Sequence, residues 1–113
     1  MRSIRLEPKD FESDCSEESL ALDIAESGEL SLSAFLQALD IAWPAVQAPQ
    51  PQPLAGLQQH AMVREHLAQH AQIELGDASF WQVFCLDEPE WNDVHLLLIS
   101  DALFIHYHWF TTA

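Results

Sequence analysis

The sequence predicts an α+β fold in which about three N-terminal helices pack on a C-terminal three-stranded antiparallel β-meander. Two observations lead to this prediction. Apolar residues recur at helical spacing through much of the first 76 residues, and runs of aromatic and branched residues with turn-like breaks fill the remainder. A chain of 113 residues with 49% hydrophobic content can bury one core. We therefore expect a single domain, 1–113, with a helical part, 1–76, and a meander, 78–113.

The first part of the chain is expected to form a short strand and two helices. Ser3–Leu6 has the composition of a short strand. Glu17–Ser27 places apolar residues at helical spacing before Gly28, which predicts the first helix. Ser31 can cap a second helix that ends before Pro44, because the residue preceding a proline is pushed out of the α region. The apolar side of this second helix comprises Leu32, Phe35, Leu36, Leu39 and Trp43.

A proline- and glutamine-rich segment, 47–53, separates the second helix from the third. Its alternating prolines favour a polyproline conformation, so we expect a stiff connector. The third helix is predicted over Leu54–Leu75. Arg64 falls on its apolar side, where a guanidinium needs an anionic partner, so we predict a structural ion pair for Arg64. His66 and His70 lie one turn apart on the opposite side, which we expect to be solvated.

The last third of the chain is expected to form the meander. Its three strands are Ser79–Leu86, Val94–Ile99 and Ala102–Phe110. Both parts of the chain should contribute to the core, which we expect to contain Leu20, Ile24, Phe35, Leu36, Leu39, Leu57, Leu67, Phe84, Leu96, Leu98, Ile105 and Tyr107.

The final hairpin carries the strongest candidate metal ligands. A two-residue turn at 100–101 places His95 opposite His106. The same register places Asp93 opposite His108, on the same side of the sheet. Three imidazoles and a carboxylate suit zinc or a related divalent ion, whereas a three-residue turn would move His95 to the other side. We favour no metal and no other cofactor, and expect these histidines to edge the core or an interface.

No catalytic constellation is recognisable, so we do not expect an enzyme. Three glycines cannot supply the usual phosphate-binding loop. Cys85 lies in an apolar alternation typical of a buried strand, and Cys15 lies in an acidic stretch, so reduced thiols fit better than a disulfide. The sequence shows neither a signal peptide nor an apolar run of membrane-spanning length, so we expect a cytoplasmic protein.

Charge is the strongest functional signal in the sequence. Eighteen acidic residues against four lysines and arginines give a formal net charge of −14. The acids concentrate between Glu7 and Glu29 and again between Glu74 and Asp93. Such a surface repels nucleic acid and anionic membranes and attracts a basic protein or a cation. We therefore predict a basic protein as the partner, and neither nucleic acid nor membrane.

Two acidic segments are the predicted partner-binding sites. One surrounds a tryptophan, a residue type common in binding hot spots, and the other belongs to the N-terminal acidic run. Their residues are Glu88, Glu90, Trp91, Asp93, Asp14, Glu17 and Glu18. The outer strands of the meander would also allow a homodimer.

In size and charge the chain resembles bacterial immunity proteins, which neutralise a cognate toxin, often a nuclease. This resemblance implies a small acidic inhibitor of a basic toxin or effector. Two alternatives stay open: a nucleic-acid mimic of the anti-restriction or anti-CRISPR kind, and a metal-binding regulator that uses the hairpin histidines. A charge that serves solubility alone is the simplest alternative.

Overall fold

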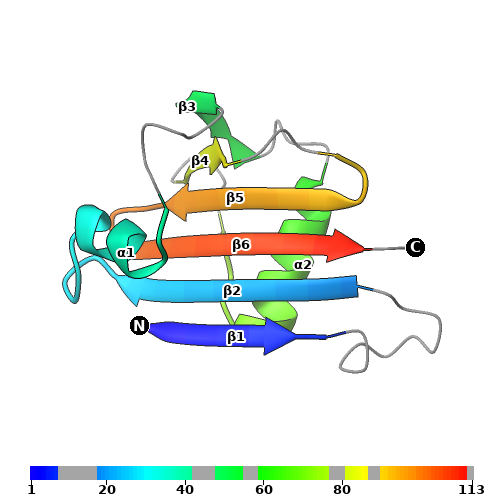
Figure 1. Ribbon diagram of the computed structural model, residues 1–113, viewed down its shortest axis with the longest axis horizontal. Helices are drawn as coiled ribbons and strands as arrows, with labels where there is room; N and C mark the ends of the chain where they lie inside the picture. The colour runs from blue at the N-terminus through cyan, green and yellow to red at the C-terminus, as the bar shows by residue number, and fades with distance from the viewer. Residues whose placement is uncertain (8–17, 42–47, 55–58, 77–80, 87–89, 112–113) are drawn as a thin grey trace.

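The central feature of the fold is one antiparallel sheet, seen in a computed structural model that describes residues 1–7, 18–41, 48–54, 59–76, 81–86 and 90–111. Within these residues the sheet has six strands in the order β1-β2-β6-β5-β4-β3. Two helices accompany it (Figure 1). The elements are β1 (Arg2–Leu6), β2 (Glu18–Glu26), α1 (Leu32–Ala38), β3 (Ala48–Pro53), α2 (His60–Ala71), β4 (Gln82–Cys85), β5 (Asp93–Ile99) and β6 (Leu103–Thr111).

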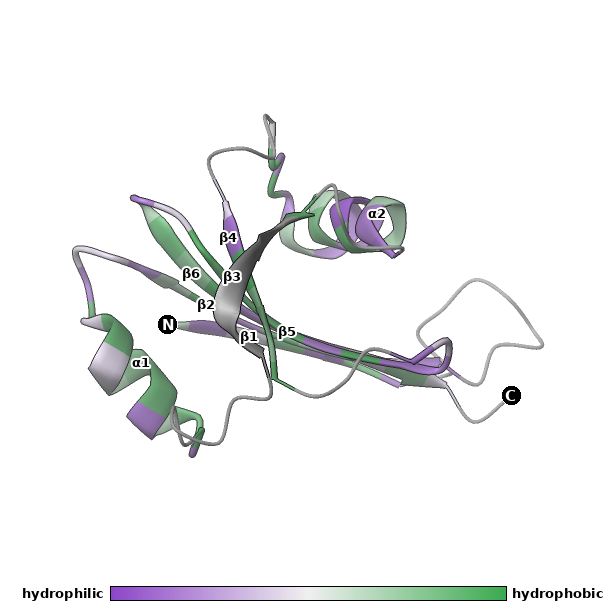
Figure 2. Ribbon diagram, turned by 90° about the horizontal axis from the view of Figure 1, so that it is seen from above, coloured by the Kyte–Doolittle hydropathy of each residue, from purple (hydrophilic) through white to green (hydrophobic). Residues whose placement is uncertain are grey.

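The two helices lie on opposite faces of the sheet, as Figure 2 shows. The larger core lies between α2 and the sheet and includes Leu22, Leu67 and Tyr107, all with 0% exposure. A smaller core lies on the other face, where α1 packs Phe35 and Leu36 over one end of the sheet. Because α1 has only seven residues, it covers only one end of this face of the sheet. No other described helix lies on this face, so its remaining area is formed by side chains of the strands.

The predicted fold class is wrong in its arrangement, because strands occupy much of the part expected to be helical. Glu17–Ser27 was predicted as a helix, yet β2 pairs with β1 on one side and with β6 on the other. Its sequence also fits a strand, because Leu20, Leu22 and Ile24 alternate and all face α2. The long pairing with β6 supplies contacts that a local helical preference cannot match.

The prediction of a stiff connector at 47–53 is also wrong, because residues 48–53 form the edge strand β3. It pairs with β4 through Ala48 opposite Cys85 and Gln52 opposite Val83, with an irregularity between the two pairs. Alternate backbone N–H groups of a strand point to the same side. Prolines at alternate positions therefore remove donors from one side only, which suits an edge strand that pairs on its other side.

The helices and the remaining strands agree better with the sequence. α1 begins after Ser31, whose Oγ accepts from the Ala34 N–H at 3.1 Å, as expected for an N-cap. Its predicted end is wrong, because α1 stops at Ala38 rather than just before Pro44, and Asp40 already has a positive φ of 58°. The third predicted helix is present as α2 but is shorter than expected at both ends. The expected strand at 3–6 is β1, and the three strands of the meander are β4, β5 and β6.

The predicted core is largely buried, with two exceptions. Leu39 is only partly buried, and Leu57 lies outside the described residues. The fold also places a polar residue in the core that was expected to be solvated, since His66 has 8% exposure. No helix among the described residues is long and apolar enough to cross a membrane.

Candidate functional site

A row of polar side chains occupies the face of the sheet opposite α2, beyond the end that α1 covers. Successive side chains of a strand point to opposite faces, and the strand registers place Asp23 opposite His106 and His95 opposite His108. We call Asp23, His106, His95, His108 and Asp93 the imidazole chain. It crosses three neighbouring strands, β2, β6 and β5.

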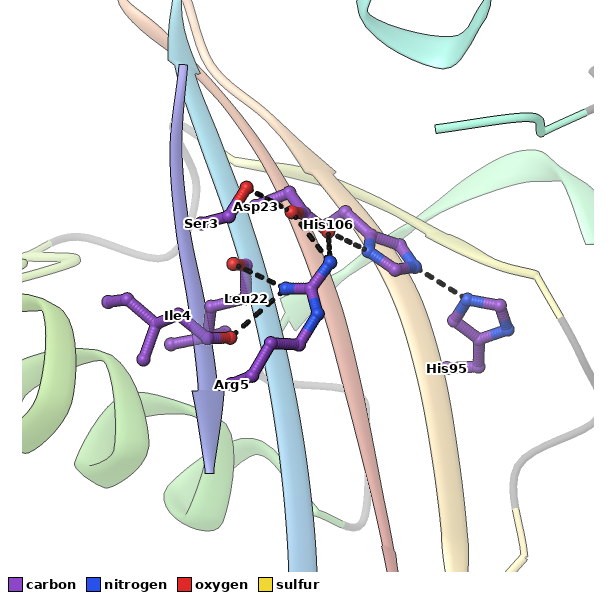
Figure 3. Close-up of polar contacts among 7 residues, drawn as sticks. All are labelled: Ser3, Ile4, Arg5, Leu22, Asp23, His95 and His106. Atoms are coloured by element: carbon purple, nitrogen blue, oxygen red, sulfur yellow. Dashed lines mark hydrogen bonds and ion pairs between the residues drawn. The ribbon is translucent and has the colours of Figure 1, made fainter. Parts of the chain in front are cut away.

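Asp23 is the buried end of the imidazole chain (Figure 3). Its side chain has 1% exposure, and its carboxylate accepts from Ser3 Oγ at 2.7 Å, from Arg5 Nη2 at 3.0 and 3.1 Å and from His106 Nδ1 at 2.9 Å. Burial acts to raise the pKa of Asp23, but the hydrogen bonds from these three residues outweigh it and hold the pKa below its ordinary value. The carboxylate is therefore ionised at neutral pH and can only accept, so Nδ1 of His106 carries a hydrogen.

The next contact joins two imidazoles nitrogen to nitrogen. Nε2 of His106 lies 2.7 Å from Nε2 of His95. Burial lowers the pKa of His106, although its hydrogen bond with Asp23 acts in the opposite direction. A neutral His106 with a hydrogen on Nδ1 presents a lone pair at Nε2. His95 must then donate its Nε2–H, so the network assigns a tautomer to both rings.

The other end of the imidazole chain, at His108 and Asp93, is more exposed to solvent. The rings of His95 and His108 stack with centroids 4.2 Å apart, and His108 Nε2 lies 3.0 Å from Asp93 Oδ1. Side-chain exposure rises from 11% at His106 to 29% at His108 and 45% at Asp93. His108 also contacts the ring of Phe110, with centroids 5.3 Å apart. The chain thus runs from the sheet interior to one corner of the sheet.

That corner carries two of the three large hydrophobic residues that are exposed in the described part of the molecule. Trp91 is 71% exposed and Phe110 is 38% exposed. The turn before β5 is held by two backbone hydrogen bonds between Glu90 and Asp93, and Asp93 lies opposite Phe110 in the β5–β6 pair. We call Glu90, Trp91, Asp93 and Phe110 the corner surface. It combines exposed aromatic area with carboxylates.

The predicted partner-binding residues are not all gathered by the structure. Glu90, Trp91 and Asp93 lie together in the corner surface. Glu18 lies at the same end of the sheet, opposite Thr111, but its carboxylate is on the α2 face, where it accepts from Trp109 Nε1 at 3.0 Å. The remaining predicted residues, Glu88, Asp14 and Glu17, lie outside the described residues.

Arg64 donates from Nη2 to the backbone carbonyl of Gly76 at 2.9 Å, and this contact is exposed. The guanidinium thus binds a backbone carbonyl in the segment that follows α2. The predicted structural ion pair of Arg64 stays a prediction.

The hairpin histidines do cluster, although their pairing differs from the predicted one. The turn lies one residue later than expected, because Ser100 N–H donates to Leu103 O at 3.0 Å and Ser100 Oγ accepts from the Ala102 and Leu103 N–H groups. His95 therefore faces His108 rather than His106. The change moves the register by two residues, which keeps every side chain on its predicted face.

The described residues do not form an assembled set of metal ligands. No group of three or more histidine, cysteine, aspartate or glutamate side chains among them is placed to hold a metal ion. The reason is visible in the imidazole chain, where the Nε2 atoms of His95 and His106 point at each other and that of His108 points at Asp93. Rings would have to turn before three donors converged on one point.

Covalent chemistry finds little support in the described residues. Cys85 faces the larger core with 2% exposure, and burial raises the pKa of its thiol, so the reactive thiolate is disfavoured. Asp23 and His106 form an acid–imidazole pair that in other settings orients a general base. Here Nε2 of His106, the nitrogen that would act as the base, already accepts a hydrogen bond from His95.

Two polar contacts were missed from the sequence. His66 was expected on a solvated side, yet its Nδ1 lies 2.7 Å from the hydroxyl of Tyr107 inside the larger core. The charge pattern alone does not distinguish Asp23 from the other acids. Its position between Leu22 and Ile24, in a run that alternates when it is read as a strand, was the available signal for a residue on the opposite face.

Comparison with known proteins adds no relative. No protein-family model matches the chain, and searches of curated proteins and of solved structures find no significant match.

Proposed function

We propose that this protein binds a basic protein and inhibits it, and that the corner surface is where the partner docks. The observation that carries this proposal is that Trp91, 71% exposed, and Phe110, 38% exposed, both lie at one corner of the sheet that also carries the carboxylates of Glu90 and Asp93. The most specific form of the proposal is a cytoplasmic immunity-type protein whose partner is a toxin or effector.

Exposed aromatic residues at one corner of the sheet favour a protein-binding surface. Tryptophan is enriched among the residues that carry most of the binding energy in protein interfaces. The backbone beneath Trp91 is held in place, because Thr111 N–H donates to Asn92 O at 3.0 Å and Glu90 bonds to Asp93. A partner would therefore meet a surface whose backbone is already ordered, which lowers the entropy lost on binding.

Charge determines the kind of partner. With a net charge of −14, the protein attracts a cationic surface from a distance, and such steering raises association rates by about 10–10³-fold at low salt. Glu90 and Asp93 supply negative charge at the corner surface itself. A basic active-site cleft, such as that of a nuclease, would have its charge neutralised by this contact.

The test is a binding measurement with matched charge reversals. Proteins retained from a lysate of the source cells on immobilised protein would be purified, and their affinity for the isolated protein measured by calorimetry. Glu90→Lys should raise the Kd about tenfold, which corresponds to ~1.4 kcal/mol, and Trp91→Ala should raise it at least as much. Glu65→Lys, on the exposed side of α2, makes the same charge change away from the corner surface.

The control decides the outcome. Equal affinities for Glu90→Lys and Glu65→Lys would remove the corner surface from the interface and leave only a general effect of charge. A partner without net positive charge, or no 1:1 complex at all, would contradict the proposal as a whole.

A further inference from the structure

We propose that the imidazole chain makes docking at the corner surface depend on protonation, so that the protein holds a cationic partner at neutral pH and releases it as the chain gains protons. This inference rests on the proposed function, because it assigns a regulation to the same surface. It is carried by the nitrogen-to-nitrogen contact between His95 and His106 and by the stack that joins this contact to the corner.

The contact between the two Nε2 atoms can hold one hydrogen only. At 2.7 Å, one ring must donate and the other must accept. His106 has its second nitrogen committed to the ionised Asp23, so Nε2 is the one site at which it can gain a proton. When both rings are imidazolium, two N–H groups would point at each other, and the rings must separate.

The charged groups around these rings come from four strands. Among the described residues, β1 contributes Arg5, β2 contributes Asp23, β5 contributes Asp93 and β6 contributes His108. Helix α1 on the same face contains no ionisable side chain. Arg5 compensates Asp23, which leaves the exposed end negative while the imidazoles are neutral. Each proton that this cluster gains would make the face less negative.

The stack transmits this change to the corner surface. His95 stacks on His108, His108 contacts Phe110 at a centroid distance of 5.3 Å, and His108 is hydrogen bonded to Asp93. Both Phe110 and Asp93 belong to the corner surface. Separation of the rings would therefore shift the aromatic residue that a partner contacts, at the same time as the added charge repels a cationic partner.

The experiment uses the full chain and a short synthetic oligolysine peptide as the cationic probe, followed by NMR. At about pH 7.5 the peptide should shift the backbone signals of the corner surface. At about pH 5, where carboxylates remain largely ionised, these shifts should fall about threefold or more, while shifts at other acidic positions persist. Histidine ring spectra without peptide should show the Nδ1–H tautomer of His106 at the higher pH and rings that separate at the lower one.

Two variants separate the mechanism from a general effect of pH. His95→Gln keeps an N–H donor toward His106 but cannot gain a proton, so docking should lose most of its pH dependence. His106→Asn keeps a donor toward Asp23 and should act in the same direction if the first variant folds poorly. His60→Gln, at the start of α2, removes an imidazole from the other side of the sheet and should leave the pH dependence unchanged.

Each failure has a distinct meaning. If the peptide shifts the corner signals equally at both pH values, or if His95→Gln retains the full pH dependence, the proton switch is wrong and the docking surface survives. If the peptide shifts no corner signal at either pH, the docking surface is wrong and the switch falls with it. If one equivalent of Zn²⁺ alone shifts the ring signals of His95, His106 and His108 together, the cluster is a metal site and the switch is overturned.

Discussion

His106 Nδ1 lies 2.9 Å from Asp23 Oδ2, across the boundary between β6 and β2. The two residues are 83 positions apart in sequence, and their contact lies on the face of the sheet that α2 does not cover. The carboxylate has 1% exposure and also accepts from Ser3 and Arg5. Asp23 therefore joins three strands through one side chain, which gives a buried charge a structural purpose.

The first prediction is that Asp23→Asn destabilises the fold by about 1–3 kcal/mol, because the amide cannot accept all the donors that converge on the carboxylate. The pKa of Asp23 is held low, so its stabilising contribution is present above the ordinary carboxyl range and is lost as the pH falls through the folded-state pKa. Urea unfolding at neutral pH and at acid pH would show a large difference between the two proteins at neutral pH only.

Asp101→Asn is the matched control for this change. Asp101 is exposed in the turn between β5 and β6, so its substitution should change stability by less than about 0.5 kcal/mol. Equal stability of Asp23→Asn and Asp101→Asn at neutral pH would show that the buried network stabilises nothing.

The second prediction concerns the hydrogen bond between His66 and Tyr107 in the larger core. Burial lowers the pKa of His66, and burial raises the pKa of Tyr107, so both groups are neutral. Tyr107→Phe leaves Nδ1 of His66 buried without this hydroxyl and should cost about 1–3 kcal/mol. A double-mutant cycle with His66→Phe, read by chemical unfolding, should show coupling of about 1 kcal/mol.

The depressed pKa of His66 also fixes the direction of a pH effect. A histidine that is neutral when folded stabilises the fold above its ordinary pKa, and this contribution is lost as the pH falls toward the folded-state value. The melting temperature of the wild type should therefore decline below about pH 6.5, and His66→Phe should flatten part of that decline. An unchanged slope would show that His66 is already solvated in the folded protein.

Several parts of this arrangement could be predicted from the sequence because their signals are local. The Ser31 cap and the strands of the meander depend on residues close together in the chain. The clustering of His95, His106 and His108 was also predictable despite the wrong turn position. A register error of two residues preserves the face of every side chain, and an error of one would have dispersed them.

The parts that could not be predicted depend on pairing between distant segments. Residues 18–26 fit a helix and a strand, and the choice is made by β6, which follows far along the chain. The proline-rich segment 48–53 becomes a strand because β4 offers a partner on one side. Unless residues 18–26 are read as a strand, nothing in the sequence singles out Asp23 from the other acids. The buried end of the imidazole chain was missed for this reason.

The third prediction concerns the end of α2. Gln72 has φ 56° and ψ 37°, in the left-handed region, while Ile73 N–H donates to Leu67 O at 3.0 Å. A residue with a Cβ is strained there, so Gln72→Gly should stabilise the protein by up to about 1 kcal/mol, less the entropy gained by the unfolded chain. Gln69→Gly, within the same helix, should instead cost about 1 kcal/mol. Chemical unfolding of both variants would show opposite signs, and a loss in both would contradict the proposed relief of strain.

The fourth prediction compares the same substitution at two tryptophans. Trp109 has 7% exposure and donates from Nε1 to Glu18 at 3.0 Å, so Trp109→Phe should lose packing and a hydrogen bond and cost about 1–3 kcal/mol. Trp91 is 71% exposed, so Trp91→Phe should change stability by less than about 0.5 kcal/mol. Thermal unfolding of the two variants measures the difference directly. A melting temperature lowered equally by Trp91→Phe would mean that this side chain packs within the fold, and the corner surface would then lose its anchor for a partner.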